Sequence, residues 1–571
     1  MAEIRFVMAE ELATESYELA VGSDGIQIRA SSRRGLFYGA VTLRQWLSSH
    51  NSAGSANPIP GVEIRDRPDF ARRGFLLDIS RNKVPTMESL LRLVDLLAEL
   101  KLNELQLYME HTFAYPGHEE VWRDASPLTA DEIQQLDGYC RLRCIELVPN
   151  QNSFGHFHRW LTHPRYRHLA ECPEGVQHAF SDEIEPFSLC PTDPATLELL
   201  RDLYGKLLPN FTSGRFHVGF DETFEIGRGR SSTTCAEIGL DQVYLRHLES
   251  VRKLAAEHNR RVQIWADMVL AYRGLVDKIP GDVVLCAWGY EADHPFRRDL
   301  AFLAATNCEI HVCPGTSSWS SFAGRAQNAL INLEEAASAG IAAGATGYLI
   351  TDWGDRGHLQ PLAASYLGLA AGAAFAWNRT EAKHRDPGDW AAAIDRWVLD
   401  SPECGLGEAT LELANVYQIT GATQKNGTAL FHLLMSPDDG LENPRYRGLS
   451  REGLDSAREI IRSAVTKMAR AETQSLEARR TRDELLWVAG TLRLACTVGE
   501  ARLDSPFSEL SGLPAETRAA LGGELAELAE QRRELWLERN RPGGLEDSLR
   551  QFTKFASRLE GVGSRGPARR L

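Results

Sequence analysis

The 571-residue chain has no run of about 18 apolar residues and no basic N-terminal segment followed by an apolar one. These absences favour neither a membrane-spanning helix nor Sec-dependent export. Its ten cysteines are scattered singly, without the CxxC pairs of a zinc ribbon or the density of a disulfide-rich fold. We therefore expect a cytoplasmic protein whose cysteines are mostly reduced core residues.

The chain also has fewer basic than acidic residues. The 63 Lys and Arg residues against 78 Asp and Glu residues give a formal net charge of -15. Broad binding to nucleic acid or to an anionic membrane needs a basic surface, so neither partner is predicted. Hydrophobic residues at 43% and charged residues at 25% are typical of a globular chain, whose length allows about two to four domains.

Residues 1–65 predict a small α+β domain. The segments ESYELAVG and GIQIRAS alternate apolar and polar residues on either side of the turn Ser23-Asp24-Gly25, a pattern typical of a β-hairpin. The following segment LFYGAVTLRQWL has apolar residues at helical spacing, and NSAGSANPIPG has the composition of a linker.

Residues 66–384 alternate short apolar runs with amphipathic helical segments such as MESLLRLVDLLAELK. Eight such units over about 300 residues predict a (β/α)8 TIM barrel. A doubly wound open sheet stays possible, because periodicity does not reveal strand order. The eight runs span residues 72–80, 103–110, 145–151, 216–222, 262–268, 283–290, 309–316 and 347–355.

Residues 385–571 contain no strand pattern and are rich in Ala, Leu, Glu and Arg, which predicts an α-helical C-terminal region. The terminal GVGSRGPARRL has the composition of a frayed tail. The helical region either caps the barrel or forms the interface of a homodimer, and the sequence leaves both open.

The carboxyl ends of barrel strands line the active site of such folds, so the residues there indicate function. A pyranose ring presents an apolar face that indole rings cover and a rim of hydroxyls that Asp, Arg and Asn hydrogen-bond. Four of the chain's twelve tryptophans fall at these ends, which predicts a carbohydrate site. The residues at the eight ends are Asp78 and Arg81; Glu110 and His111; Asn150, Asn152 and His156; Asp221 and Glu222; Trp265 and Asp267; Trp288 and Tyr290; Pro314 and Trp319; Asp352, Trp353 and Asp355.

Asp221 and Glu222 are adjacent acids at the end of the fourth run. Neighbours on a regular strand point to opposite faces, so both carboxylates reach one pocket only if the strand has ended. Cleavage of a glycosidic bond needs an acid for the leaving oxygen and support for the oxocarbenium-like carbon. The pair is therefore the predicted catalytic centre.

The motifs RGFLLDISRNKVP, KLNELQLY, PNQNSFGH, FHVGFDE and DWGD, in this order and spacing, resemble glycoside hydrolase family 20, the β-N-acetylhexosaminidases. The strand-four motif is the most specific, since the family has His-x-Gly-Gly-Asp-Glu where this chain has HVGFDE from His217 to Glu222. The resemblance covers residues 10 to 380, including the small domain before the barrel, and leaves out the helical region.

The resemblance implies an exo-acting retaining hydrolase in which the acetamido group of a terminal GlcNAc or GalNAc attacks the anomeric carbon. Asp221 would orient that acetamido group, while Glu222 would protonate the leaving oxygen and then activate water. The implied substrate is an oligosaccharide or glycoconjugate, without a cofactor or metal. The implied substrate-binding residues are Arg81, His111, His156, Trp265, Trp288, Trp319, Trp353 and Asp355.

Two segments depart from the family pattern. After strand two the family reads His-Leu-Thr-Asp or similar, where this chain has Tyr108 to His111, and on strand seven Thr316 to Phe322 contains neither the usual Tyr nor the following Asp. Three alternatives stay open: a relative with altered sugar specificity, a non-catalytic carbohydrate-binding protein, and a metal-dependent hydrolase. The sixteen histidines match neither an HExxH motif nor a compact ligand set, which disfavours the last.

Overall fold

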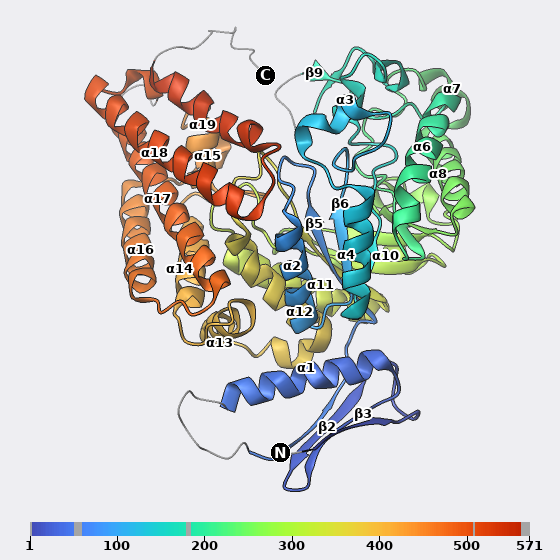
Figure 1. Ribbon diagram of the computed structural model, residues 1–571. Coiled ribbons are helices and arrows are strands. Elements are labelled where there is room, and N and C mark those ends of the chain that lie inside the picture. The colour runs from blue at the N-terminus through green and yellow to red at the C-terminus, as the bar shows by residue number, and fades with distance from the viewer. Residues whose placement is uncertain (1–2, 51–59, 179–183, 506–508, 561–571) are drawn as a thin grey trace.

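The computed structural model describes residues 3–50, 60–178, 184–505 and 509–560 (Figure 1). Most of the predicted linker and all of the predicted frayed tail lie outside these ranges. All ten cysteines are free thiols and seven of them are buried, in line with the expectation. No helix in the described ranges combines the length and the apolar character needed to cross a membrane.

The N-terminal module is a four-stranded sheet with one helix packed on it. The predicted hairpin is present, because the second and third strands pair antiparallel from Tyr17↔Ala30 to Gly22↔Gly25. The helix lies between this sheet and the barrel, where Gln45 donates a hydrogen bond to the backbone oxygen of Glu99 (Figure 1). The elements are β1 (Ile4–Met8), β2 (Tyr17–Gly22), β3 (Gly25–Ala30), α1 (Arg33–His50) and β4 (Val62–Asp66), in sheet order β1-β3-β2-β4.

The second module is an eight-stranded parallel sheet in the order β10-β11-β12-β13-β14-β5-β6-β7. A parallel bridge between Asn150 and His217 joins the two ends of this order and closes the barrel. The predicted TIM barrel is thereby confirmed over the open sheet. Its strands are β5 (Arg72–Asp78), β6 (Glu104–Tyr108), β7 (Glu146–Val148), β10 (Arg215–His217), β11 (Arg261–Trp265), β12 (Val284–Trp288), β13 (Glu309–Cys313) and β14 (Gly347–Asp352).

Amphipathic helices surround this barrel, as their spacing of apolar residues predicts. In α2, for example, Leu90, Leu93, Val94 and Leu97 form the buried face. The main barrel helices are α2 (Met87–Glu99), α4 (Ala130–Leu142), α6 (Pro194–Leu207), α8 (Leu240–Glu257), α10 (Phe296–Leu303), α11 (Ala326–Ala343) and α12 (Tyr366–Ala382).

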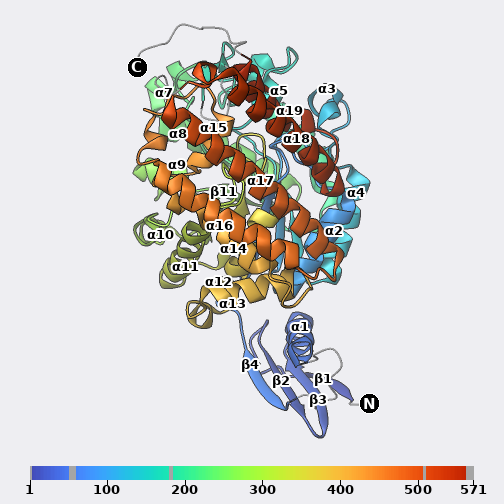
Figure 2. The same cartoon turned by 90° about the vertical axis from the view of Figure 1, so that its left-hand side faces the viewer.

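The C-terminal region is helical, as predicted, and packs along one side of the barrel (Figures 1 and 2). Its last helix contacts loops at the strand ends, where the Ser548 hydroxyl donates to the backbone oxygen of Gly357. The predicted dimer and the domain boundaries at residues 65 and 384 stay predictions. The helices are α13 (Pro387–Ala393), α14 (Leu406–Ile419), α15 (Ala429–Met435), α16 (Arg451–Arg470), α17 (Leu476–Asp504), α18 (Ala515–Arg539) and α19 (Leu545–Leu559).

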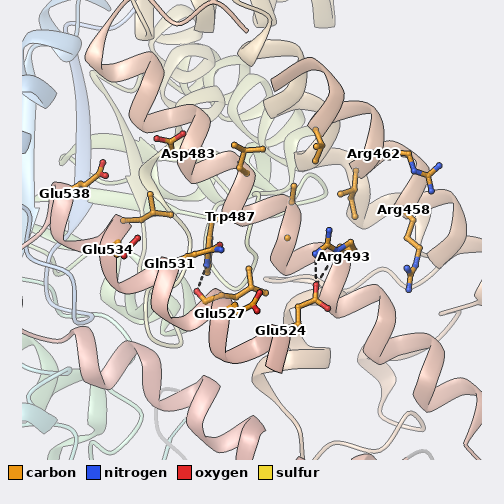
Figure 3. A pocket seen from close by; sticks show the side chains of 17 residues that line it. Arg458, Arg462, Asp483, Trp487, Arg493, Glu524, Glu527, Gln531, Glu534 and Glu538 are labelled. Carbon is orange, nitrogen blue, oxygen red and sulfur yellow. Dashed lines mark hydrogen bonds and ion pairs between the residues drawn. The ribbon is translucent and has the colours of Figure 1, made fainter. Parts of the chain in front are cut away.

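A groove of about 740 Å³ lies between α16, α17 and α18 (Figure 3). Arginines of α16 and α17 stand on one side and glutamates of α18 on the other, and Arg493 pairs with Glu524 across it at 2.8 Å. Trp487 forms part of its lining and donates its indole N–H to the backbone oxygen of Leu528. The groove therefore belongs to the helical region alone and contributes no residue to the barrel mouth.

Candidate active site

Asp221 and Glu222 follow β10 in a segment that no longer has strand geometry. Gly219, Phe220 and Glu222 have left-handed backbone angles, with φ of 74°, 76° and 51°. This conformation breaks the alternation of side chains along the strand. Both carboxylates consequently reach the same atom, Nε2 of His156, each at 3.2 Å. Both acids therefore point toward the same side chain, as the sequence analysis required.

His156 lies between the two carboxylates and is 1% exposed. Burial by itself lowers the pKa of His156, but the charge of Asp221 and hydrogen bonds to both acids more than offset it and raise the pKa to about 10. Burial also opposes ionisation of Asp221, yet the charged imidazole holds the pKa of Asp221 below its usual value. At neutral pH the geometry therefore favours an imidazolium bound to an ionised Asp221.

The same three residues are the one group in the described ranges whose possible metal-binding atoms lie within 4.8 Å of one another. A metal ligand histidine must present an unprotonated nitrogen. Here Nε2 of His156 faces two acids, and its raised pKa keeps the proton on the ring at neutral pH. The cluster is an ion-pair network of one imidazole and two carboxylates.

Asp267, at the end of β11, is a third acid in the cluster. Its Oδ2 accepts the backbone N–H of Glu222 at 3.0 Å and so fixes the position of that residue. Burial and the negative charge of Asp221 raise the pKa of Asp267 to about 7. The sequence placed Asp267 at a strand end but assigned it no role, because its contact with Glu222 is made through the backbone.

Arg81 connects four strand ends at the mouth of the barrel. Its guanidinium lies 3.1 Å from Asp78, 3.7 Å from Glu110 and 3.8 Å from Asp355. It also contacts Nδ1 of His156 at 3.4 Å. The sequence-predicted residues Arg81, His156 and Asp355 therefore belong to one constellation with the acid pair.

His111 is a predicted residue that the structure does not bring to this constellation. It is 6% exposed, and within the described chain no hydrogen bond or ion pair joins it to Asp221 or Glu222. Burial and the nearby Arg159 lower the pKa of His111 to about 3. Glu110, the neighbour of His111, is the residue of this strand end that reaches the constellation. Its carboxylate accepts a hydrogen bond from the Tyr108 hydroxyl at 3.0 Å and lies 3.7 Å from His156.

Aromatic side chains form a wall beside the acids. The rings of Trp265 and Trp353 lie 5.9 Å apart, and Tyr108 meets Trp353 edge to face at 4.9 Å. Trp288 stacks on Tyr290 at 5.2 Å, and the Trp353 indole donates to the Tyr290 hydroxyl at 2.9 Å. Tyr290, which the sequence did not assign to the site, therefore couples two of the predicted tryptophans.

Several buried polar atoms of this wall have no protein partner. These atoms are the indole nitrogens of Trp265 and Trp288, Oδ1 of Asp221 and Oδ1 of Asp267. Orphaned buried polar atoms are rare in folded proteins and costly. Two donors and two acceptors at the ends of neighbouring strands are an arrangement suited to a hydroxyl- and amide-bearing ligand.

Trp319 packs in the same cluster as Trp265 and Trp353, and it meets Tyr290 edge to face at 5.0 Å. It is 1% exposed, and its indole N–H donates to Oδ1 of Asn426 at 2.6 Å. Asn426 belongs to the helical region and also donates its backbone N–H to Glu291 at 2.7 Å. Trp319 is thus a support of the wall, and the helical region helps to hold it.

Replacement of Gly219 by alanine is expected to destabilise the protein by about 2 kcal/mol or more, from left-handed strain and overpacking. A Cβ there would lie 2.1 Å from Oδ1 of Asn152. The free energy of unfolding in urea measures the loss. Gly214→Ala is the matched control, because a Cβ at Gly214 meets nothing within 4 Å. Equal stability of the two variants would contradict this account of the turn.

Replacement of Asp267 by asparagine is expected to stabilise the protein increasingly as the pH rises from about 4 to about 7. Because the pKa of Asp267 is raised from 3.8 to about 7, its ionisation costs folding free energy once the pH exceeds the unfolded value. Asparagine keeps the acceptor for Glu222 and removes that cost, by about 2–3 kcal/mol more at pH 8 than at pH 5. Urea unfolding at both pH values measures it, and a gain independent of pH would refute the assignment.

An eight-stranded α/β barrel with paired acids, an arginine and tryptophans at its strand ends has the groups that glycoside hydrolysis requires. Two family descriptions match the chain: "Glycosyl hydrolase family 20, catalytic domain" over residues 70–307 and "Glycosyl hydrolase family 20, domain 2" over residues 2–67. The chain belongs to glycosyl hydrolase family 20.

Individual relatives agree with this assignment. "Beta-hexosaminidase subunit A1" of Dictyostelium discoideum is 27% identical over 217 residues, which cover 36% of this chain and 39% of that protein. For this relative and two further beta-hexosaminidases, the matched segment spans 36 to 46% of the relative's own length.

Two solved structures share the fold. One, described as a beta-N-acetylhexosaminidase, has a TM-score of 0.59 and 19% identity, covering 70% of this chain and 91% of that one. The chitobiase of Flavobacterium johnsoniae has a TM-score of 0.57 and 17% identity, covering 95% of this chain and 86% of that one. The latter match extends over the helical region.

Proposed function

We propose that the protein is an exo-acting, retaining β-N-acetylhexosaminidase that removes terminal GlcNAc or GalNAc from oligosaccharides or glycoconjugates. The observation that carries the proposal is the approach of adjacent Asp221 and Glu222 to one buried imidazole. In the two-carboxylate mechanism the nucleophile and the acid lie about 5 Å or more apart, with the sugar between them. Asp221 and Glu222 are adjacent and contact the same nitrogen, so they do not flank the sugar in that way. A nucleophile supplied by the substrate removes that requirement.

In the proposed first step, the acetamido oxygen attacks the anomeric carbon and the bond to the leaving oxygen breaks. Glu222 gives its proton to that oxygen, and Asp221 binds the acetamido N–H and stabilises the positive charge that develops on the oxazolinium ring. In the second step, water attacks the anomeric carbon while Glu222 takes its proton, and the ring opens to restore the acetamide. Two displacements at one carbon retain its configuration.

The remaining residues have binding roles in this proposal. Arg81 and Asp355 bind ring hydroxyls, since they face each other at the mouth. Trp265, Trp288 and Trp353 cover the apolar faces of the sugar and the acetamido methyl group. His156 is a positioning residue that holds both acids. No step requires a metal or an organic cofactor.

We further propose residues 66–384 as the catalytic unit, with residues 1–65 and 385–571 as companion regions. The ten free thiols suit a reducing compartment, which supports a cytoplasmic location.

A panel of 4-nitrophenyl β-glycosides tests the reaction and the specificity together. We expect hydrolysis of the β-GlcNAc and β-GalNAc glycosides and a kcat/KM lower by about 10³ or more for the β-glucoside, which has no acetamido group to attack. Equal rates on the β-glucoside would exclude obligate acetamido participation and favour the relative with altered specificity. Binding of the sugars without any hydrolysis would favour a carbohydrate-binding protein.

A further inference from the structure

A second groove, of about 420 Å³, lies on the flank of the barrel where the three regions of the chain meet. Its lining comes from α1 of the N-terminal module, from α2 of the barrel, and from the π-helical turn Ile394–Val398 and the start of α17 in the helical region. None of the described residues that line it belongs to the candidate active site. Its volume is in the range of small-molecule sites, which often lie between domains.

Trp397 is a residue of this groove that internal packing does not explain. It is half-buried, and within the described chain it belongs to none of the hydrophobic clusters and meets no other aromatic ring. Its indole N–H has no hydrogen-bond partner among the described residues, and the guanidinium of Arg396 lies 5.7 Å from its ring centroid. An indole that lines a groove without supporting the core is a platform for the apolar face of a ligand.

Asp400 is a second residue of the lining without a structural role. Its backbone has a φ of 47°, in the left-handed region that few residues other than glycine adopt. Its side chain is exposed, and in the described part of the chain its carboxylate makes no hydrogen bond or ion pair. The segment around it is fixed, because the carboxylate of Asp395 accepts the backbone N–H of Gly405 at 2.9 Å. Strained backbone that its surroundings hold in place is a feature of binding sites.

The charges of the lining balance each other. Three of the four arginines have ion pairs with carboxylates, whereas Arg396 and Asp400 have none among the described residues. A guanidinium and a carboxylate without charge partners, in a groove with no net charge, suit a neutral ligand that both donates and accepts hydrogen bonds. The charged residues are Arg44, Arg92, Arg396 and Arg539 against Asp95, Glu99, Asp400 and Glu477.

A pyranose ring matches these features together. Its apolar C–H face stacks on an indole, and its hydroxyls donate to a carboxylate and accept from a guanidinium. A charged ligand would gain little from a balanced lining. A purely apolar ligand would take Arg396 and Asp400 out of water without replacing their hydrogen bonds, which costs free energy.

We propose that this groove is a second, non-catalytic saccharide-binding site, with Trp397 as its platform and Arg396 and Asp400 as its hydrogen-bonding residues. Its ligand class is a neutral oligosaccharide of pyranose units. The site does not depend on the proposed function, because it needs no turnover and shares no residue with the acid pair. It gives the N-terminal module a part in ligand binding, since α1 supplies Arg44 and Ser48 to the lining.

Saturation-transfer NMR with N,N′-diacetylchitobiose tests the site on the full-length protein. The barrel mouth is first saturated with a thiazoline analogue of GlcNAc, which resembles the oxazolinium ring. We expect the blocked wild-type protein still to bind the disaccharide, with a Kd of about 1 mM, a strength that a few stacking and hydrogen-bonding contacts provide. Trp397→Ala is expected to weaken this binding by about tenfold or more, because it removes the platform.

Asp400→Asn keeps the size of the side chain and removes its charge, and it is expected to weaken binding by about fivefold or more. Trp46→Ala is the matched control for the loss of an indole. Trp46 is a half-buried tryptophan of α1 that stacks on His50 at 4.1 Å and is outside the groove. It is expected to leave the Kd unchanged.

Absence of binding to the blocked wild-type protein, or an equal Kd for Trp397→Ala and the wild type, would overturn the site. A wild-type dimer that dissociates in Trp397→Ala, followed by sedimentation velocity, would also overturn it, because a second copy of the chain would then cover the groove. Absence of hydrolysis in the glycoside panel would refute the proposed function instead. The loss of binding in Trp397→Ala would still assign the saccharide to this groove, so the two failures are separate results.

Discussion

Glu222→Gln is expected to slow the hydrolysis of a methyl β-GlcNAc glycoside by about 10²–10⁴-fold, the usual contribution of general acid catalysis. A 2,4-dinitrophenyl glycoside is expected to form the intermediate almost as fast as with the wild type, because its leaving group departs without a proton. Glutamine keeps the size of the side chain and the backbone contact with Asp267. Values of kcat/KM for the two substrates measure the difference.

Glu237→Gln on α7 (Ser232–Ile238) is the matched control, since Glu237 is exposed and outside the site. It is expected to leave both rates unchanged. Full activity of Glu222→Gln on the methyl glycoside would remove Glu222 from the role of acid, and an equal loss on both substrates would indicate that the substitution damages the pocket.

Asp221→Asn is expected to lower kcat/KM for both kinds of leaving group by about 10²–10³-fold, because the charge that stabilises the oxazolinium ring is needed whatever leaves. The same change removes the main electrostatic cause of the raised pKa of His156. The pKa of His156, followed by NMR titration of its ring protons, is therefore expected to fall from about 10. A structural defect alone would not produce that shift in a protein that still unfolds cooperatively.

The exposed Asp277→Asn is the control for the loss of one carboxylate in the same part of the chain. If Asp221→Asn slowed only the substrate with the poor leaving group, Asp221 would act by assisting protonation by Glu222 and not by binding the acetamido group.

The barrel was predictable because its strands and helices differ in hydrophobic period. The fourth run shows the limit of that signal. Residues 216–222 look like one continuous strand, but regular pairing as a strand covers only Arg215–His217, and the chain then turns at Gly219. A left-handed turn leaves no trace in apolar periodicity, although it is the feature that lets both acids point into one pocket.

The site residues were predictable where a motif fixes them and not where a contact crosses the chain. Arg81, His156 and Asp355 lie with the acid pair, whereas strand two supplies Glu110 rather than its neighbour His111. Which of two adjacent polar residues faces inward depends on a single step of register. The contact between Trp319 and Asn426 joins residues 107 positions apart, and no local sequence pattern predicts it.

The most direct test of substrate-assisted catalysis varies the nucleophile itself. Fluorine on the acetamido methyl group makes the carbonyl oxygen less nucleophilic and changes little else at the anomeric carbon. Along the acetyl, fluoroacetyl, difluoroacetyl and trifluoroacetyl series of 4-nitrophenyl glycosides, kcat/KM is expected to fall steeply and in order. A flat dependence would show that the acetamido oxygen takes no part in bond breaking, and it would contradict the role proposed here for Asp221 and Glu222.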